Sequence, residues 1–189
     1  MKGECDMGRN VIVISASGRR GGNSDLLCDE LVRGAQEAGG RAEKVRLSEL
    51  NIGYCQGCGA CFSAHRCVQR DDMDALSARL KAADAIVMAS PVYFYSINGQ
   101  LKAMIDRLCP HAGELKGKDF YFILSAADTD EPGLERAVEP LRGLLDCVPG
   151  AHERALLYAR GVFAAGEVRG TEYMQMAYEL GREAGEDRA

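Results

Sequence analysis

Long apolar stretches are missing from this sequence of 189 residues. Nowhere does it reach the ~18 consecutive apolar residues that a membrane-spanning helix needs. The first ten residues, MKGECDMGRN, also lack the apolar core of a secretory signal peptide. We therefore expect a protein of the cytoplasm that makes no contact with a membrane.

An excess of positive charge is missing as well. The chain has 23 Lys and Arg residues against 28 Asp and Glu residues, which gives a formal net charge of -5. Proteins that bind nucleic acids usually carry clustered basic residues, so we expect no nucleic-acid partner. The sequence also lacks internal repeats, linkers and low-complexity segments, which predicts a single domain over residues 1–189 with frayed ends at 1–8 and 185–189.

What is present is an alternation of apolar and amphipathic segments. The apolar segments expected to be strands are 10–15, 42–47, 85–90, 120–125 and 154–158. The amphipathic segments expected to be helices are 24–38, 71–83, 97–108, 134–146 and 171–184. This alternation predicts an α/β fold, a doubly wound, five-stranded parallel sheet of order 2-1-3-4-5 in a three-layer α/β/α sandwich. Ligands of such sheets bind outside the carboxyl ends of the strands, where the strand order reverses.

A glycine-rich turn, SASGRRGGNSD at residues 15–25, joins the first predicted strand to the first predicted helix. Such a turn directs backbone N–H groups and the positive end of the helix dipole toward one point, which suits a phosphate. Ser15, Ser17, Asn23 and Ser24 can add hydrogen bonds, and Arg19 or Arg20 can add positive charge. The turn matches neither G-x-G-x-x-G nor G-x-x-x-x-G-K-[ST], so we expect a monophosphate and not a dinucleotide or nucleoside triphosphate. The alternative is a polar turn in which Asn23 or Ser24 only caps the helix.

Aromatic residues gather just after the third predicted strand. Pro91 is expected to end this strand, and Tyr93, Phe94 and Tyr95 follow it. In a 2-1-3-4-5 sheet this loop lies beside the glycine-rich turn, so its backbone groups and rings can hold a flat heteroaromatic ring. Residues 128–130 follow the next strand at the same edge and can contact the ring or a substrate. The alternative is that the aromatic side chains form a hydrophobic plug.

These segments carry a family resemblance. SGRRGGNS (17–24), DDM (71–73), SPVYFYSINGQLKAMIDR (90–107) and AADTDEPGLERAVEPLRGLLDC (126–147) resemble the NADPH-dependent FMN reductase group of the flavodoxin-like superfamily. The resemblance covers most of the chain. It implies FMN as the bound cofactor, NAD(P)H as the electron donor, and a homodimer or homotetramer. It implies no catalytic side chain, because the flavin itself carries the redox chemistry.

The same resemblance assigns cofactor-binding residues. Those that would hold the FMN phosphate are Ser17, Arg19, Asn23 and Ser24. Those that would line the ring and the ribityl chain are Pro91, Val92, Tyr93, Phe94 and Ser96. Tyr95 departs from the family pattern, because relatives often carry glycine there, and its larger side chain is expected to restrict access above the flavin.

Four of the eight cysteines lie close together in a cysteine-rich loop predicted over residues 54–70. They are Cys55, Cys58, Cys61 and Cys67, in a C-x2-C-x2-C-x5-C pattern. Thiolates at this spacing can surround a 4Fe–4S cluster, whereas zinc sites more often combine two separated C-x2-C pairs. The pattern resembles that of iron-sulfur flavoproteins, a branch of the same flavodoxin-like group. A 4Fe–4S cluster, a zinc ion and free thiols stay open as alternatives.

Three further cysteines are expected to have a different role. Cys28, Cys109 and Cys147 fall on or beside apolar helical faces, where a thiol usually serves as a small core residue. We therefore expect all three in the core and none of them at a functional site.

The motifs and the resemblance together predict an FMN-dependent oxidoreductase that passes electrons to a small-molecule or protein acceptor, with NAD(P)H as the electron donor that the resemblance implies. One alternative is an iron-sulfur flavoprotein electron carrier, in which a ferredoxin-like protein exchanges electrons with a 4Fe–4S cluster that relays them to FMN. A further alternative is a zinc-stapled flavin-binding module.

Overall fold

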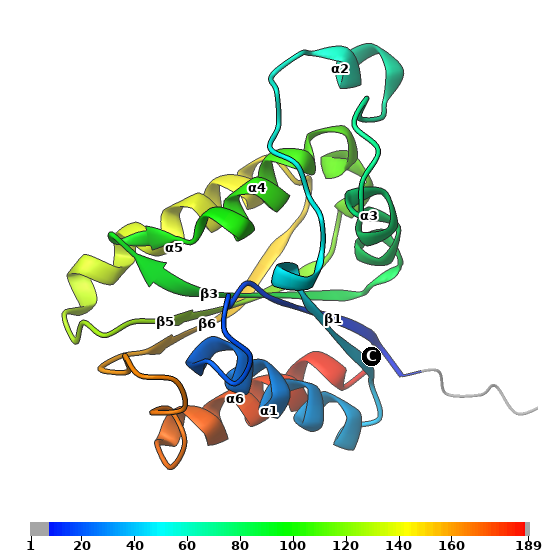
Figure 1. Cartoon of the computed structure of the whole chain (residues 1–189). Helices are drawn as coiled ribbons and strands as arrows, with labels where there is room; N and C mark the ends of the chain where they lie inside the picture. The colour runs from blue at the N-terminus through cyan, green and yellow to red at the C-terminus, as the bar shows by residue number, and fades with distance from the viewer. Residues whose placement is uncertain (1–7, 188–189) are drawn as a thin grey trace, which may run out of the picture.

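A twisted parallel sheet forms the middle layer of the computed structural model, which describes residues 8–187 (Figure 1). Its parallel strands, in spatial order, are β2 (Arg41–Arg46), β1 (Asn10–Ser15), β3 (Ala85–Tyr93), β5 (Asp119–Ser125) and β6 (His152–Ala159). A sixth, two-residue strand, β4 (Ser96–Ile97), pairs antiparallel with the end of β3. Apart from this addition, the order is the predicted 2-1-3-4-5, so the predicted fold class is confirmed.

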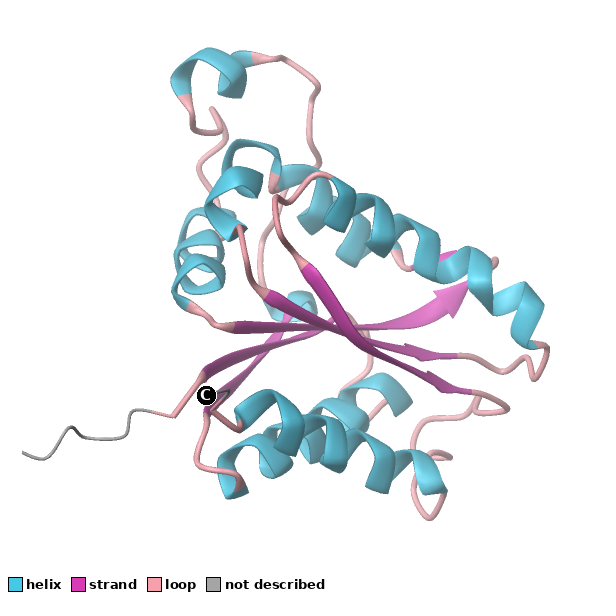
Figure 2. Ribbon diagram, turned by 180° about the vertical axis from the view of Figure 1, so that it is seen from behind, coloured by secondary structure: helices cyan, strands magenta, loops and turns pink. Residues whose placement is uncertain are grey.

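Helices cover both faces of the sheet (Figure 2). One face carries α1 (Asn23–Glu37) and α6 (Glu172–Gly185), and the other carries α3 (Met73–Ala82), α4 (Gly99–Arg107) and α5 (Glu131–Asp146). Three short elements lie in the connections, namely the 3-10 helices η1 (Leu47–Glu49) and η2 (Cys109–Leu115) and helix α2 (Ala60–Ala64).

Strand β1 shows why the sheet needs helices on both sides. Val11 and Val13 are buried in the core that includes α1 and α6, whereas Ile12 and Ile14 are buried in the core that includes α3, α4 and α5. Successive side chains of a strand point to opposite faces, so a continuous run of β-branched residues needs a hydrophobic core on each face of the sheet.

Strand β3 continues beyond the predicted end at Pro91. Pro91 is the last residue of β3 that pairs with β5, opposite Ser125. Proline lacks a backbone N–H, but at the end of a ladder this loss is tolerated. The strand therefore passes through Pro91 and turns back as the β3–β4 hairpin, and the prediction that Pro91 ends the strand is wrong.

Both ends of the chain were expected to be frayed, over residues 1–8 and 185–189. Of these, residues 1–7 and 188–189 lie outside the described residues. Gly185 is still part of α6 and is buried. Within residues 8–187, no helix has both the length and the hydrophobicity that crossing a membrane requires.

Helices α1 and α6 pack with their backbones in close contact. A Cβ atom added at Gly181 of α6 would overlap the carbonyl oxygen of Leu31 in α1, and one added at Gly34 of α1 would overlap the carbonyl oxygen of Tyr178. Backbone atoms in two packed helices cannot move aside as a flexible side chain can. The small residues therefore set how closely α1, which begins at the glycine-rich turn, is held to α6.

Replacing Gly181 by alanine should lower the free energy of unfolding by about 1–3 kcal/mol, the usual cost of overpacking. The matched control is Gly143→Ala in α5, where an added Cβ would meet no atom within 4 Å. Alanine favours the helix over glycine, so this control should raise stability by roughly 0.5–1 kcal/mol. Urea denaturation of both variants measures the difference, and a Gly181→Ala protein as stable as the parent would contradict the close packing.

Candidate functional site

A cavity of about 140 Å³ opens at the carboxyl ends of β1, β3, β5 and β6. All of the residues predicted to hold the cofactor line it except Phe94 and Ser96. The cavity is completed by residues that the sequence analysis did not single out, namely Ser125, Ala126, Ala127, Val162 and Phe163. Ser125 is the last residue of β5 and the others follow β5 or β6, so their position at or just after the ends of predicted strands was the signal that could have found them.

The glycine-rich turn presents the start of α1 to this cavity. The N-cap of α1 is Gly22, in an extended conformation, and glycine has no side chain to bond the N–H groups of the first helical turn. Those groups and the positive end of the helix dipole are therefore available to an anion. The alternative, a turn in which Asn23 or Ser24 caps the helix, does not hold, because the N-cap is Gly22 and both residues lie within α1.

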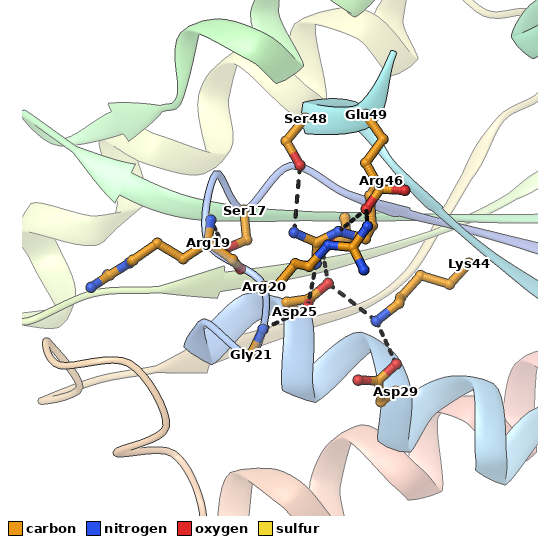
Figure 3. Close-up of polar contacts among 11 residues, drawn as sticks. Ser17, Arg19, Arg20, Gly21, Asp25, Asp29, Lys44, Arg46, Ser48 and Glu49 are labelled. Carbon is orange, nitrogen blue, oxygen red and sulfur yellow. Dashed lines mark hydrogen bonds and ion pairs between the residues drawn. The ribbon is translucent and has the colours of Figure 1, made fainter.

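The buried carboxylate of Asp25 holds the turn in place (Figure 3). Asp25 accepts hydrogen bonds from Ser15 Oγ at 2.9 Å, from the backbone N–H of Gly21 at 3.0 Å and from Lys44 Nζ at 3.1 Å, and it forms an ion pair with Arg46. Burial by itself would raise the pKa of Asp25, but the bonds from Gly21, Ser15 and Lys44 bring the pKa below its ordinary value. The side chain is therefore an anion that fixes the glycine-rich turn to β2.

The two arginines of the turn have different positions. Arg19 lines the cavity, points away from the Asp25 cluster, and donates to the carbonyl oxygen of Phe163 at 3.3 Å (Figure 3). Arg20 is exposed and pairs with Glu49 of η1 at 2.6 Å. Arg19 is thus the arginine of the turn that can reach an anion in the cavity.

Asn23 and Ser24 line the cavity but also have structural partners. The Asn23 amide donates to the carbonyl oxygen of Ala164 at 3.0 Å and accepts from the N–H groups of Gly166 and Val168 at 3.1 and 3.2 Å. It thereby anchors the loop that follows β6 and carries Phe163. A second N–H of the same amide can still donate to a ligand. Ser24 Oγ lies 2.7 Å from Ser125 Oγ at the end of β5.

Asn98 joins the glycine-rich turn to the β3–β4 hairpin. Its buried side chain donates to the carbonyl oxygen of Ala16 and caps α4 by accepting from the N–H of Leu101 at 3.0 Å. Its own N–H donates to Ser90 Oγ at 3.0 Å. Asn98 was missed because the predicted helix begins at residue 97, two residues before the observed start of α4 at Gly99, and an asparagine just before a helix is a common cap.

The tip of the β3–β4 hairpin consists of Phe94 and Tyr95, both in the left-handed region with φ of 50° and 56°. Two positive φ values in a two-residue hairpin turn are typical of type I′, which favours Asn-Gly. Glycine at position 95 would therefore suit this backbone better than tyrosine. The aromatic pair adopts the same turn at a cost in backbone energy.

Tyr95 turns away from the cavity. Its hydroxyl donates to Asp128 Oδ2 at 2.9 Å in the loop after β5, and its ring lies beside Gly133 in the first turn of α5. Tyr95 does not line the cavity, and its expected effect on access above the flavin stays a prediction. Phe94 is fully exposed, and Ser96 pairs with Tyr93 in the hairpin.

The four motif cysteines surround a second cavity of about 130 Å³ in the loop that carries α2. This loop stands away from the sheet (Figure 1). A fifth cysteine, Cys109 at the start of η2, lines the same cavity. Within residues 8–187, no three His, Cys, Asp or Glu side chains converge on a point where they would share one metal ion.

The predicted core position of the remaining cysteines is right in one case only. Cys28 is buried, but Cys109 and Cys147 are exposed. Both lie where a helix has just ended, Cys109 after α4 and Cys147 as the C-cap of α5. The helical periodicity used to place them no longer applies there, so the prediction for these two residues is wrong.

An ion pair closes the base of the cysteine-rich loop. Arg107 of α4 binds Asp71 through two hydrogen bonds of 2.6 and 3.0 Å and donates to the carbonyl oxygen of Gly53 at 2.8 Å. The N–H of Gly53 in turn donates to Asp71 at 2.9 Å. Since Gly53 precedes the cysteines and Asp71 follows them, the pair ties both ends of the loop to α4. The bonds from Arg107 hold the pKa of Asp71 below its ordinary value.

Comparison with known proteins identifies the family of this chain. The family described as NADPH-dependent FMN reductase matches residues 9–160. Among curated proteins, an iron-sulfur flavoprotein of Archaeoglobus fulgidus is 41% identical over 110 residues, which are 57% of this chain and 50% of the relative. An iron-sulfur flavoprotein of Methanosarcina thermophila is 38% identical over 94 residues, which are 50% of this chain and 49% of the relative. The chain thus spans about half the length of the curated relatives it matches.

Solved structures share the fold. A structure described as flavone reductase has a TM-score of 0.71 at 20% identity and covers 93% of this chain and 62% of its own. The NAD(P)H:quinone oxidoreductase from Methanothermobacter marburgensis has a TM-score of 0.65 at 18% identity and covers 94% of this chain and 95% of its own. At 18–20% identity these likenesses show a shared fold alone.

Replacing Asp71 by asparagine should lower the free energy of unfolding at pH 7 by on the order of 3 kcal/mol, because the guanidinium of Arg107, with only 1% of its side chain exposed, loses its counter-charge. The pKa of Asp71 is lower in the folded protein than in the unfolded chain, so its stabilisation is complete above the ordinary carboxyl pKa of about 3.9 and is lost as pH falls through the lower, folded value. The deficit of the variant should therefore shrink toward pH 3.

Chemical denaturation of parent and variant at pH 7 and at low pH measures this difference. Asp74→Asn is the control, since Asp74 is exposed and pairs with Arg70 at 3.5 Å; it should change stability by less than about 0.5 kcal/mol. A deficit of Asp71→Asn that stays constant with pH would show that the ion pair is not its source.

Proposed function

Because the chain belongs to the NADPH-dependent FMN reductase family, we propose that it is an oxidoreductase that binds FMN and takes electrons from NAD(P)H. The observation that carries this proposal is the cavity at the carboxyl edge of the sheet, which is lined by Ser17, Arg19 and the start of α1 on one side and by residues 91–93 on the other. The predicted phosphate-binding turn and the β3–β4 hairpin thus meet at one cavity.

The donor set suits a phosphomonoester. Gly22 leaves the first-turn N–H groups of α1 open, and Arg19 supplies a guanidinium that can bind two phosphate oxygens. The cavity is small, so the phosphate and the ribityl chain would occupy it, while the ring would lie against the exposed part of Tyr93 and Phe94.

Bound FMN would supply the redox chemistry, the acceptance of a hydride equivalent from NAD(P)H and the release of electrons singly or in pairs. The residues of this chain would bind and orient it. Asp25 would fix the glycine-rich turn, and Asn98 would fix this turn to the hairpin. Asn23 would hold the loop that carries Phe163. We propose a small molecule or a protein as the electron acceptor.

A second candidate function rests on the cysteine cavity. The cavity supports an iron-sulfur electron carrier, with Cys55, Cys58, Cys61 and Cys67 as ligands of a 4Fe–4S cluster and a ferredoxin-like protein as electron partner. Each iron of such a cluster takes one thiolate, so thiols distributed around a cavity suit it. Zinc draws its thiolates onto one ion, which is the arrangement that the described side chains do not make. A zinc-stapled module is therefore the weaker alternative.

Assembly and location complete the proposal. Large apolar side chains such as Tyr54, Phe62 and Phe94 are more than three-quarters exposed; burial of such side chains between copies would favour the proposed homodimer or homotetramer. The free thiols of the cysteine cavity suit a reducing compartment such as the cytoplasm.

The proposed function is tested first by the absorption spectrum of protein purified without oxygen, with iron, sulfide and zinc assayed on the same sample. We expect flavin peaks that respond to NADH or NADPH. About four irons and four sulfides per chain would establish the cluster, whereas flavin without iron would leave a plain FMN reductase. A protein that retains no flavin and binds no added FMN would refute the proposal.

The phosphate placement is tested by Arg19→Gln. A charge-assisted bond is worth roughly 1.5–3 kcal/mol, so the Kd for FMN should rise on the order of 10-fold to 100-fold. The Kd for riboflavin, which lacks the phosphate, should not change. Arg20→Gln is the matched control, because Arg20 is 81% exposed and pairs with Glu49. An equal loss of affinity for FMN and riboflavin, or an equal loss of FMN affinity in both variants, would contradict the assignment.

A further inference from the structure

Cys109 brings a fifth thiol to the cysteine cavity. It lies far from the motif in sequence, at the start of η2, yet its Sγ is 3.8 Å from the Sγ of Cys61 in α2. A 4Fe–4S cluster takes four thiolates. One of the five thiols that line the cavity therefore has no place in the cluster, and it is in contact with one that does.

The pair is well placed to form a covalent bond. A disulfide has an S–S distance of about 2.05 Å, so the two sulfurs have to approach by less than two ångströms. Helix α2 has only five residues, and the residues at its two ends, Gly59 and His65, are both in the left-handed conformation. Such a short element in a loop that stands away from the sheet can make this shift. Cys109 is exposed and therefore accessible to an oxidant.

We propose that Cys61 and Cys109 form a reversible disulfide in the cluster-free chain and that this disulfide controls loading of the cysteine cavity. The part that concerns loading rests on the proposed cluster. A disulfide would remove Cys61 from the ligand set, and iron bound to Cys61 would prevent the disulfide. Oxidation and cluster assembly thus exclude one another at a single sulfur atom.

The oxidant is a low-molecular-weight disulfide such as oxidised glutathione. The thiolate of Cys109 attacks one glutathione sulfur, which forms a mixed disulfide and releases one reduced glutathione. The thiolate of Cys61 then attacks Cys109 Sγ, which forms the protein disulfide and releases the second. The two protein thiols lose two electrons and two protons, and one oxidised glutathione becomes two reduced molecules.

The disulfide is tested on the full chain after chelation of metal and reduction without oxygen. The protein is incubated with oxidised glutathione, the remaining thiols are blocked with N-ethylmaleimide, and the cross-linked peptides are identified by mass spectrometry. We expect Cys61–Cys109 as the main cross-link, and its loss in Cys109→Ser. Cys147→Ser is the control, since Cys147 is also exposed but does not line the cysteine cavity. A main cross-link within the motif, or between Cys109 and Cys147, would overturn the proposal.

Loading is tested on the same samples by adding ferrous iron and sulfide and then measuring iron per chain. The oxidised parent should take up at least 10-fold less iron than the reduced parent, and dithiothreitol should restore the uptake. Cys109→Ser should load equally before and after the oxidant. Equal loading of the oxidised and reduced parent would overturn the control of loading. Failure of the reduced parent to load at all would refute the cluster itself, and the peptide map would still decide on the disulfide.

Discussion

Parallel strands deliver all of their carboxyl ends to one edge of the sheet, and most features of this protein depend on that constraint. The glycine-rich turn follows β1, the hairpin of Phe94 and Tyr95 follows β3, and the loops that carry Asp128 and Phe163 follow β5 and β6. Four segments distant in sequence therefore meet around one cavity without any long connection. The cysteine-rich loop also starts from this edge, after β2, but its cavity is completed by Cys109 at the end of α4.

Two carboxylates, the buried Asp25 and the half-buried Asp71, hold the loops of this edge in the same manner. Asp25 accepts the N–H of Gly21 and pairs with Arg46, and Asp71 accepts the N–H of Gly53 and pairs with Arg107. Buried ion pairs bring little net stability, because desolvation offsets their attraction, but breaking one leaves an uncompensated charge. Each pair thus favours the loop conformation in which both charges are paired over conformations that would leave one charge without a partner. This is how long glycine-containing loops keep a fixed shape at the edge of the sheet.

The sequence was sufficient for the features that follow from periodicity and from glycine-rich turns. It predicted the strand order, the helical layers, and the meeting of Ser17 and Arg19 with residues 91–93 in one cavity. Side-chain partners distant in sequence were out of reach, since nothing local indicates that Asn23 binds the loop at Gly166 and Val168. Cys109 was missed for a related reason. It lies two residues past the end of α4 at Arg107, where the pattern that assigned it to the core has ended.

The turn at Phe94 and Tyr95 has a further consequence for how the edge of the sheet moves. A hairpin closed by Asn-Gly would hold its shape by local backbone preference alone. Here the unfavourable backbone conformation is accompanied by the bond from Tyr95 to Asp128, which belongs to a different loop. The bond from Tyr95 to Asp128 therefore links the two loops, so a molecule that orders one of them favours order in the other. By linkage, any factor by which ligand binding on the β3 side raises the equilibrium constant for ordering on the β5 side is the factor by which that order raises the binding constant.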